Sequence, residues 1–117
     1  FRSQRIPNHH EVIGYQCDIG LMGKDRSIWG ALYDESRRKK FMAEAPEDSL
    51  KWINKDDWNQ IRIIASGSKI EIYVNGHRTV SFTEQEKDIA ATGMIGLQIH
   101  SGPPAEAWYR NIRLKPL

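Results

Sequence analysis

The fold class follows from the stretch WNQIRIIASGSKIEIYVNG, residues 58–76. Apolar and polar side chains alternate on both sides of Gly67-Ser68, a pattern typical of two half-buried strands joined by a tight turn. Residues 61–65 and 70–74 are therefore predicted to pair as antiparallel neighbours. The side chains expected to be buried in this pair are Ile61, Ile63, Ile70, Ile72 and Val74.

Strand signals continue on both sides of this hairpin. Asn75-Gly76 offers the positive-φ residues of a type I′ turn, so a third strand, residues 77–82, is expected to fold back on the second. Residues 44–57 contain a proline and no sustained apolar period, which indicates a surface connection with one helical turn. Further strands are expected at residues 12–19, 28–33, 93–100 and 107–114. About nine short strands with turn signals every 8–12 residues predict an all-β sandwich.

Composition excludes several classes of protein. The chain has 117 residues, of which 39% are hydrophobic and 27% charged, as expected of one globular domain. The net charge of +2 is too small to predict a nucleic-acid partner, and no apolar run is long enough to span a membrane. The single cysteine, Cys17, excludes a disulfide scaffold or a zinc finger. Cys17 lies on the apolar face of its predicted strand, so we expect a small buried side chain.

Two charged clusters have a plain structural explanation. Asn8 to Glu11 includes His9 and His10, which could bind a metal, but adjacent side chains of an extended chain point to opposite sides. At most two of them should converge, which favours an exposed polar loop over a metal site. The basic run at residues 37–40 could bind phosphate, but charges between strands are usually a solvated edge.

Two other groups are candidates for a site. Residues 33–38 place two carboxylates, a phenol and two guanidinium groups at a strand end, either as a binding rim or as a solvated turn with local ion pairs. His100 follows Gln98 on the polar face of its predicted strand, and Gln16 and Asp18 hold the equivalent positions on another strand. If these strands are neighbours, one sheet carries a polar surface suited to a ligand.

Several segments carry a family resemblance. They are FRSQRIPNHHEVIGYQCDIG from Phe1, WGALYDESRR from Trp29, the hairpin described above and GMIGLQIHSGPPAEAWYRNIRLKPL from Gly93. Together they resemble the 3-keto-disaccharide hydrolase domain family over essentially the whole chain. The resemblance implies a concanavalin-like jelly-roll sandwich, an extracytoplasmic bacterial protein, and action on glycosides that are oxidised to a ketone at carbon 3.

The same resemblance bears on domain organisation. Family members have further strands before the one that begins here at Phe1, so residues 1–117 are expected to form a single β-sandwich domain that is incomplete at its N-terminus. Another chain or a preceding segment would then complete the sandwich. We expect exposed strand edges and exposed apolar surface in residues 1–117.

The implied chemistry needs a base, an acid and a group that stabilises an enolate. The ketone acidifies the proton on carbon 2, the enolate expels the group on carbon 1, and water then adds. The catalytic candidates are Asp18, Glu35 and His100, with Asp18 or His100 as the base and Glu35 as the acid. The substrate-binding candidates are Arg2, Gln16, Trp29, Tyr33, Arg37 and Gln98. A divalent metal ion could stabilise the enolate in place of an arginine, but no residue spacing identifies its ligands.

Two further interpretations stay open. The same sandwich could be a carbohydrate-binding module without turnover, or a purely structural part of a larger protein. The enzyme hypothesis makes a geometric prediction: polar residues from four regions of the sequence should converge on one concave surface. They are Arg2, Gln16, Asp18, Tyr33, Glu35, Gln98 and His100.

Overall fold

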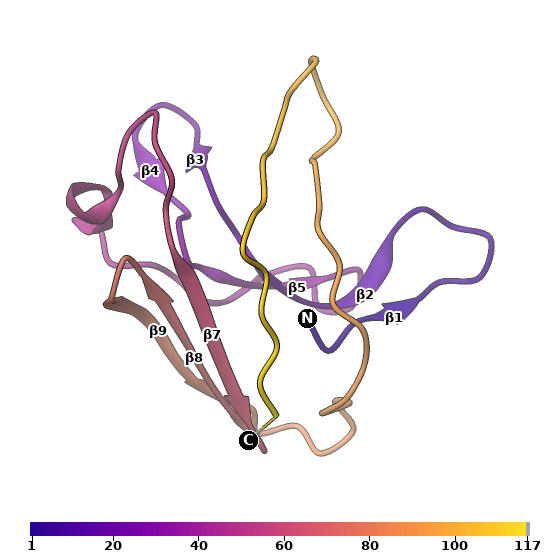
Figure 1. Ribbon diagram of the computed structural model, residues 1–117. Helices are drawn as coiled ribbons and strands as arrows, with labels where there is room; N and C mark the ends of the chain where they lie inside the picture. The colour runs from indigo at the N-terminus through magenta and orange to yellow at the C-terminus, as the bar shows by residue number, and fades with distance from the viewer. Residues whose placement is uncertain (117) are drawn as a thin grey trace.

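A computed structural model gives the fold of the protein and describes residues 1–116. These residues form nine strands in antiparallel sheets and one short 3₁₀ helix, Ser49–Trp52, within the connection that was predicted to hold a helical turn (Figure 1). The first sheet has the order β1 (Gln4–Arg5), β2 (Val12–Cys17), β5 (Leu32–Glu35) and β6 (Phe41–Ala43). The second has the order β7 (Ile61–Ser66), β8 (Lys69–Val74) and β9 (His77–Thr83), and β3 (Leu21–Met22) pairs with β4 (Arg26–Ser27). The all-β prediction is confirmed.

The predicted hairpin is present in the predicted register. Ile63 lies opposite Ile72, and Asn75 and Gly76 adopt φ angles of 49° and 84°, as a turn with two positive-φ residues requires. Ile70, Ile72 and Val74 are fully buried. The prediction that Ile63 is buried is wrong, because 36% of its surface is exposed. β7 is an edge strand of its sheet in the described chain, so fewer neighbours cover Ile63.

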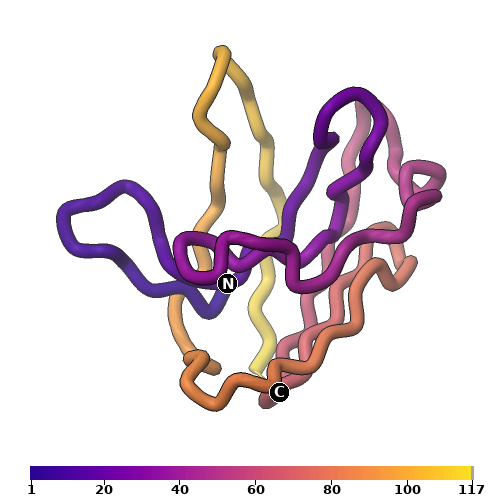
Figure 2. Tube along the Cα trace, turned by 180° about the vertical axis from the view of Figure 1, so that it is seen from behind, coloured from indigo at the N-terminus to yellow at the C-terminus, as the bar shows by residue number. Residues whose placement is uncertain are grey.

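The core lies between the first and second sheets. Its buried cluster is made of Tyr15, Leu32, Ile70, Ile72 and Val80. The two sheets meet where β6 contacts β9, and Figure 2 shows this arrangement from behind. Cys17 is half-buried and packs against this cluster, in agreement with its assignment to the apolar face of β2.

The strand predicted at residues 28–33 begins only at Leu32. Gly30 has a φ of 74°, and the Ala31 N–H donates to the Ile28 carbonyl at 2.9 Å, which closes a turn where a strand was expected. A Cβ at Gly30 would lie 2.4 Å from the Thr79 hydroxyl oxygen, which itself donates to the Gly30 carbonyl at 2.9 Å. Glycine is therefore required here both by conformation and by the close approach of β9.

The strands predicted at residues 93–100 and 107–114 do not form. The described part of this region makes one isolated bridge, between Ser3 and Met94, and rises from the sheets as a long open loop (Figures 1 and 2, orange to yellow). Its apolar side chains lack cover: Ile95, Leu97 and Ile99 are more than half exposed, and Leu114 is 79% exposed. Alternating sequence alone makes no strand, because the ladder also needs a hydrogen-bonding neighbour. The exposed apolar surface that was expected lies here.

No helix among the described residues has the length and apolar character needed to cross a membrane.

Candidate functional site

One face of β2 and β5 carries four of the predicted site residues. Gln16 and Tyr33 are directly opposite each other in the antiparallel ladder, and Glu35 lies two residues beyond Tyr33. Asp18 follows Gln16 by two residues and accepts a hydrogen bond from the Gln16 side-chain amide. Because side chains two apart share a face, Gln16, Asp18, Tyr33 and Glu35 form one polar surface opposite the core.

Asp18 is the most perturbed acid of this surface. Its residue is only 8% exposed, and its backbone is held by hydrogen bonds to Ala31 and Gly30 of 3.0 and 2.8 Å. Burial raises the pKa of its carboxyl group to about 6, and the negative charge of Glu35 acts in the same direction. The Gln16 hydrogen bond and the charge of His100 lower the pKa but do not cancel the effect of burial. A carboxylate with this pKa is suited to accept a proton near neutral pH.

Tyr33 lies opposite Gln16 and so diagonally across from Asp18, and Glu35 lies two residues further along β5, opposite Gly14. Desolvation raises the pKa of the Tyr33 phenol, and the charges of Glu35 and then Asp18 add to this effect. The Tyr33 ring meets Phe41 edge to face at 5.2 Å, which fixes its orientation. Glu35 Oε1 accepts the Ser36 N–H at 2.9 Å.

A pocket of about 380 Å³ opens beside this surface, in the size range of small-ligand sites. Ile19, the neighbour of Asp18, lies in its wall. Its other prominent residues are Trp29, Gln98, His100, Trp108 and Tyr109. The Tyr109 hydroxyl donates to the Gln98 carbonyl at 3.0 Å and so joins the two limbs of the open loop. The pocket is thus lined by aromatic faces with a few polar groups, a composition that suits a sugar ring.

His100 has a defined tautomer in its neutral form. Its Nδ1 lies 2.6 Å from the Ser101 carbonyl oxygen, which can only accept a hydrogen bond, so Nδ1 carries the proton. Nε2 is then the unprotonated nitrogen and can take part in proton transfer.

Two predicted site residues lie elsewhere. Arg2 donates to the Gly67 carbonyl at 2.7 Å, next to Tyr15 and Glu84 in a separate pocket of about 210 Å³. Arg37 pairs with Asp34 at 2.6 Å and covers the ring of Tyr15 at 4.9 Å. The structure thus brings Gln16, Asp18, Tyr33 and Glu35 together on one sheet face. Gln98 and His100 lie in the adjoining pocket on the open loop and not on a strand of that sheet, and Arg2 and Arg37 lie elsewhere.

Arg37 and Arg38 of the basic run are partly buried, which differs from the expectation of a solvated edge, whereas Lys39 and Lys40 are exposed as expected. Arg38 pairs with the fully buried Asp34 and with Glu84, the latter at 2.7 Å, and its side chain is only 13% exposed. Asp34 alternates with Tyr33 and Glu35 along β5, so its side chain lies on the core face. The alternation along β5 could therefore have predicted from the sequence that Asp34 is buried in an ion pair. It could not have identified Glu84 as the second partner of Arg38, because Glu84 is too distant in the sequence.

The prediction for His9, His10 and Glu11 is wrong in its geometry. One ligand atom from each side chain lies within 4.8 Å of the other two, although at most two were expected to converge. These residues directly follow the turn at Pro7 and Asn8, with a bend at His10, and do not form an extended strand, so the alternation of side chains does not apply.

A family model described as 3-keto-alpha-glucoside-1,2-lyase-like domain matches residues 1–115, essentially the whole chain. No curated protein and no solved structure matches the chain.

Proposed function

Since the chain belongs to the family of 3-keto-alpha-glucoside-1,2-lyase-like domains, we propose that it cleaves 3-keto-glycosides by an elimination that begins at carbon 2. The ketone at carbon 3 acidifies the carbon 2 proton, which passes to a base on the protein. The resulting enolate re-forms the carbonyl group at carbon 3, forms a new double bond between carbons 1 and 2, and expels the oxygen substituent of carbon 1, which takes up a proton. Addition of water across that double bond completes a net hydrolysis.

The observation that carries this proposal is the raised pKa of Asp18 beside a sugar-sized pocket. Removal of a carbon-bound proton needs a base that is unprotonated at the working pH yet not too weak, and a carboxyl group with a pKa of about 6 meets both conditions. Asp18 is accordingly the proposed base. His100, whose Nε2 is free in the neutral ring, is the alternative base, because its charge is close enough to lower the pKa of Asp18.

The remaining groups take the roles that their positions allow. Glu35 is the proposed acid for the leaving oxygen, and Tyr33 and Gln16 are the proposed hydrogen-bond donors to the enolate oxygen and the sugar hydroxyls. Gln98 lies in the pocket wall and is proposed to bind a hydroxyl group.

A carbohydrate-binding module without turnover is the second candidate, favoured by the aromatic lining of the pocket. Trp29, Trp108 and Tyr109 offer ring faces that can hold a sugar by stacking alone. In either case the ligand is a carbohydrate. An extracytoplasmic location is part of the proposal.

The experiment compares turnover and binding in matched variants. We expect the protein to cleave a 3-keto-α-glucoside, and Asp18→Asn or Glu35→Gln to lower kcat by about 10²-fold or more with nearly unchanged binding. Asp25→Asn removes an exposed carboxylate outside the site and should leave turnover unchanged. If the unaltered protein binds oligosaccharides but cleaves no 3-keto-glycoside, the enzyme proposal fails and the binding module is supported.

A further inference from the structure

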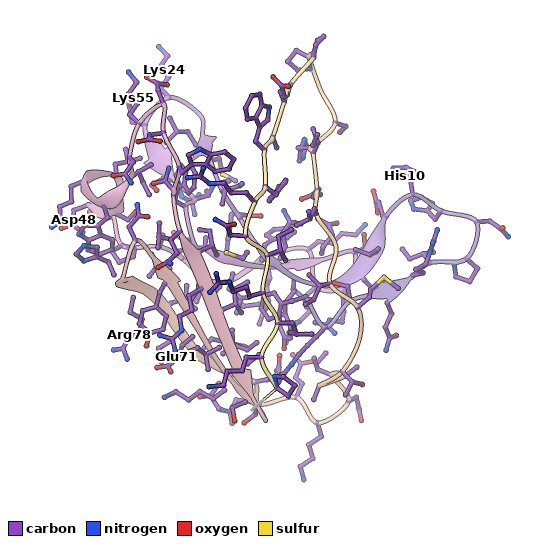
Figure 3. All side chains as sticks on the ribbon, viewed as in Figure 1. His10, Lys24, Asp48, Lys55, Glu71 and Arg78 are labelled. Carbon is purple, nitrogen blue, oxygen red and sulfur yellow. The ribbon has the colours of Figure 1, made fainter. Side chains whose placement is uncertain are left out.

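The tip of the β1–β2 hairpin gathers three side chains with metal-binding chemistry (Figure 3, His10). Ser36 connects this cluster to the candidate acid Glu35, because its hydroxyl group donates to Glu11 and its N–H donates to Glu35. The turn is built by Pro7 and Asn8: the His9 N–H donates to the Ile6 carbonyl at 3.2 Å, and Asn8 has a φ of 57°. Proline followed by a positive-φ asparagine at the central positions is typical of a type II turn. The turn thereby fixes the direction in which the next residues leave it.

The ligand set is compact before any ion is present. One donor atom each from His9, His10 and Glu11 lies within 4.8 Å of the others, and the two imidazole rings stack at 4.5 Å with an angle of 19° between them. Zn²⁺ binds nitrogen and oxygen ligands at about 2.0–2.2 Å. Because all three side chains are exposed, small rotations suffice to bring their donor atoms around one ion.

Glu11 is also held from a second element. The Ser36 hydroxyl donates to Glu11 Oε2 at 2.6 Å, which leaves the other carboxylate oxygen available. A hydrogen bond from a neighbouring group commonly orients a carboxylate that ligates a metal.

Two features oppose an ion at this place. His9 Nδ1 accepts the Glu11 N–H at 3.1 Å, so ligation through either ring nitrogen requires this bond to break. Nδ1 would give its lone pair to the ion, and Nε2 could ligate only after its proton moved to Nδ1. Lys39 is near enough for its charge to act on Glu11. Both are exposed and adjustable, whereas the turn and the Ser36 contact are built into the fold.

We propose that His9, His10 and Glu11 bind a divalent transition-metal ion of the Zn²⁺ class. Two imidazoles and one carboxylate suit Zn²⁺, Cu²⁺ or Ni²⁺ better than Ca²⁺ or Mg²⁺, which prefer ligand sets made of oxygen atoms alone. Through Glu11 and Ser36 the ion ties the hairpin tip to the end of β5, where Ser36 also contacts Glu35. The proposal does not depend on the glycosidase function.

The test is calorimetric titration of the metal-free protein with ZnCl₂, supported by the absorption of bound Co²⁺. We expect one ion per chain, and an affinity that falls at least about tenfold in His10→Ala and in Glu11→Gln. Ser36→Ala should weaken binding by about tenfold, because it removes the hydroxyl group that orients Glu11 and leaves all three ligands in place. His77→Ala is the matched control, since His77 is an exposed histidine stacked on Trp52 outside the cluster.

Circular dichroism of each variant establishes that the fold is retained, and Glu11→Gln preserves side-chain size if His10→Ala perturbs the hairpin. Absence of Zn²⁺ binding to the unaltered protein overturns the proposal. It is equally overturned if His10→Ala and Glu11→Gln bind Zn²⁺ as tightly as His77→Ala does, because the ion then binds elsewhere.

Discussion

The ion-pair network that joins the two sheets gives a stability prediction with a defined pH dependence. Glu84, directly after β9, accepts hydrogen bonds from Arg38 at 2.7 and 3.2 Å and from the Tyr15 hydroxyl group. Its side chain is only 8% exposed. These contacts, with Arg38 as the largest, lower the pKa of Glu84 from its ordinary value of 4.5 to about 2.

A lowered pKa in the folded state is a contribution to folding stability. The difference for Glu84 corresponds to about 3 kcal/mol, present in full above the unfolded pKa and lost as the pH falls from 4.5 towards 2. We therefore expect Glu84→Gln to lower the free energy of unfolding by about 2–3 kcal/mol at pH 7. The difference in the free energy of unfolding between the two proteins should decrease steadily below pH 4.5. Protonation of Glu84 then removes from the unaltered protein the same charge that the substitution removes.

Urea unfolding at several pH values measures this gap directly. Glu86→Gln is the control: Glu86 also pairs with Arg38, at 2.9 Å, but its side chain is 61% exposed, so we expect a loss of about 0–1 kcal/mol. The reasoning is refuted if the Glu84 and Glu86 variants lose equal stability at pH 7. It is also refuted if the Glu84 gap is as large at pH 3 as at pH 7.

Further predictions concern the core and the turn before β5. Ile72→Ala should lower the free energy of unfolding by about 2–5 kcal/mol and Ile63→Ala by less than half as much, since only Ile72 is fully buried; equal losses in urea unfolding would contradict the packing. Gly30→Ala should cost about 1–3 kcal/mol, because its φ of 74° and the nearby Thr79 hydroxyl leave no room for a Cβ; an unchanged Tm would contradict this. Burial raises the pKa of Cys17 to about 12, so iodoacetamide at pH 8 should modify the native thiol far more slowly than the unfolded one, and equal rates would refute it.

Local patterns in the sequence were sufficient to predict the β7–β8–β9 hairpins. The alternation around Ile72 and the dipeptide Asn75-Gly76 specify strand, register and turn within a few residues of each other. The strand predicted over residues 28–33 begins late because Gly30 meets Thr79 of β9, a contact between residues 49 apart. Such a constraint is absent from any local pattern.

Strand alternation predicts which site residues share a face within one strand, but not which strands are neighbours. Alternation within β2 and β5 places Asp18 and Glu35 on one face, but the pairing of those two strands is a tertiary property. Arg37 illustrates the limit, because its partner Asp34 lies on the core face of β5 and draws it away from the polar face. The compact arrangement of His9 to Glu11 depends on a turn, where alternation gives the wrong answer.

The central claim is that the carbon 2 proton of the sugar is removed during cleavage. The most direct measurement incubates the protein with a 3-keto-α-glucoside that carries deuterium at carbon 2, and follows the label by mass spectrometry against a sample without protein. The account predicts that every product molecule from that sugar has lost the deuterium to water, and that Asp18→Asn slows label loss and cleavage together. Deuterium fully retained at carbon 2, together with equal cleavage rates for the labelled and unlabelled sugars, would contradict it, because the bond at carbon 1 would then break without removal of the carbon 2 proton.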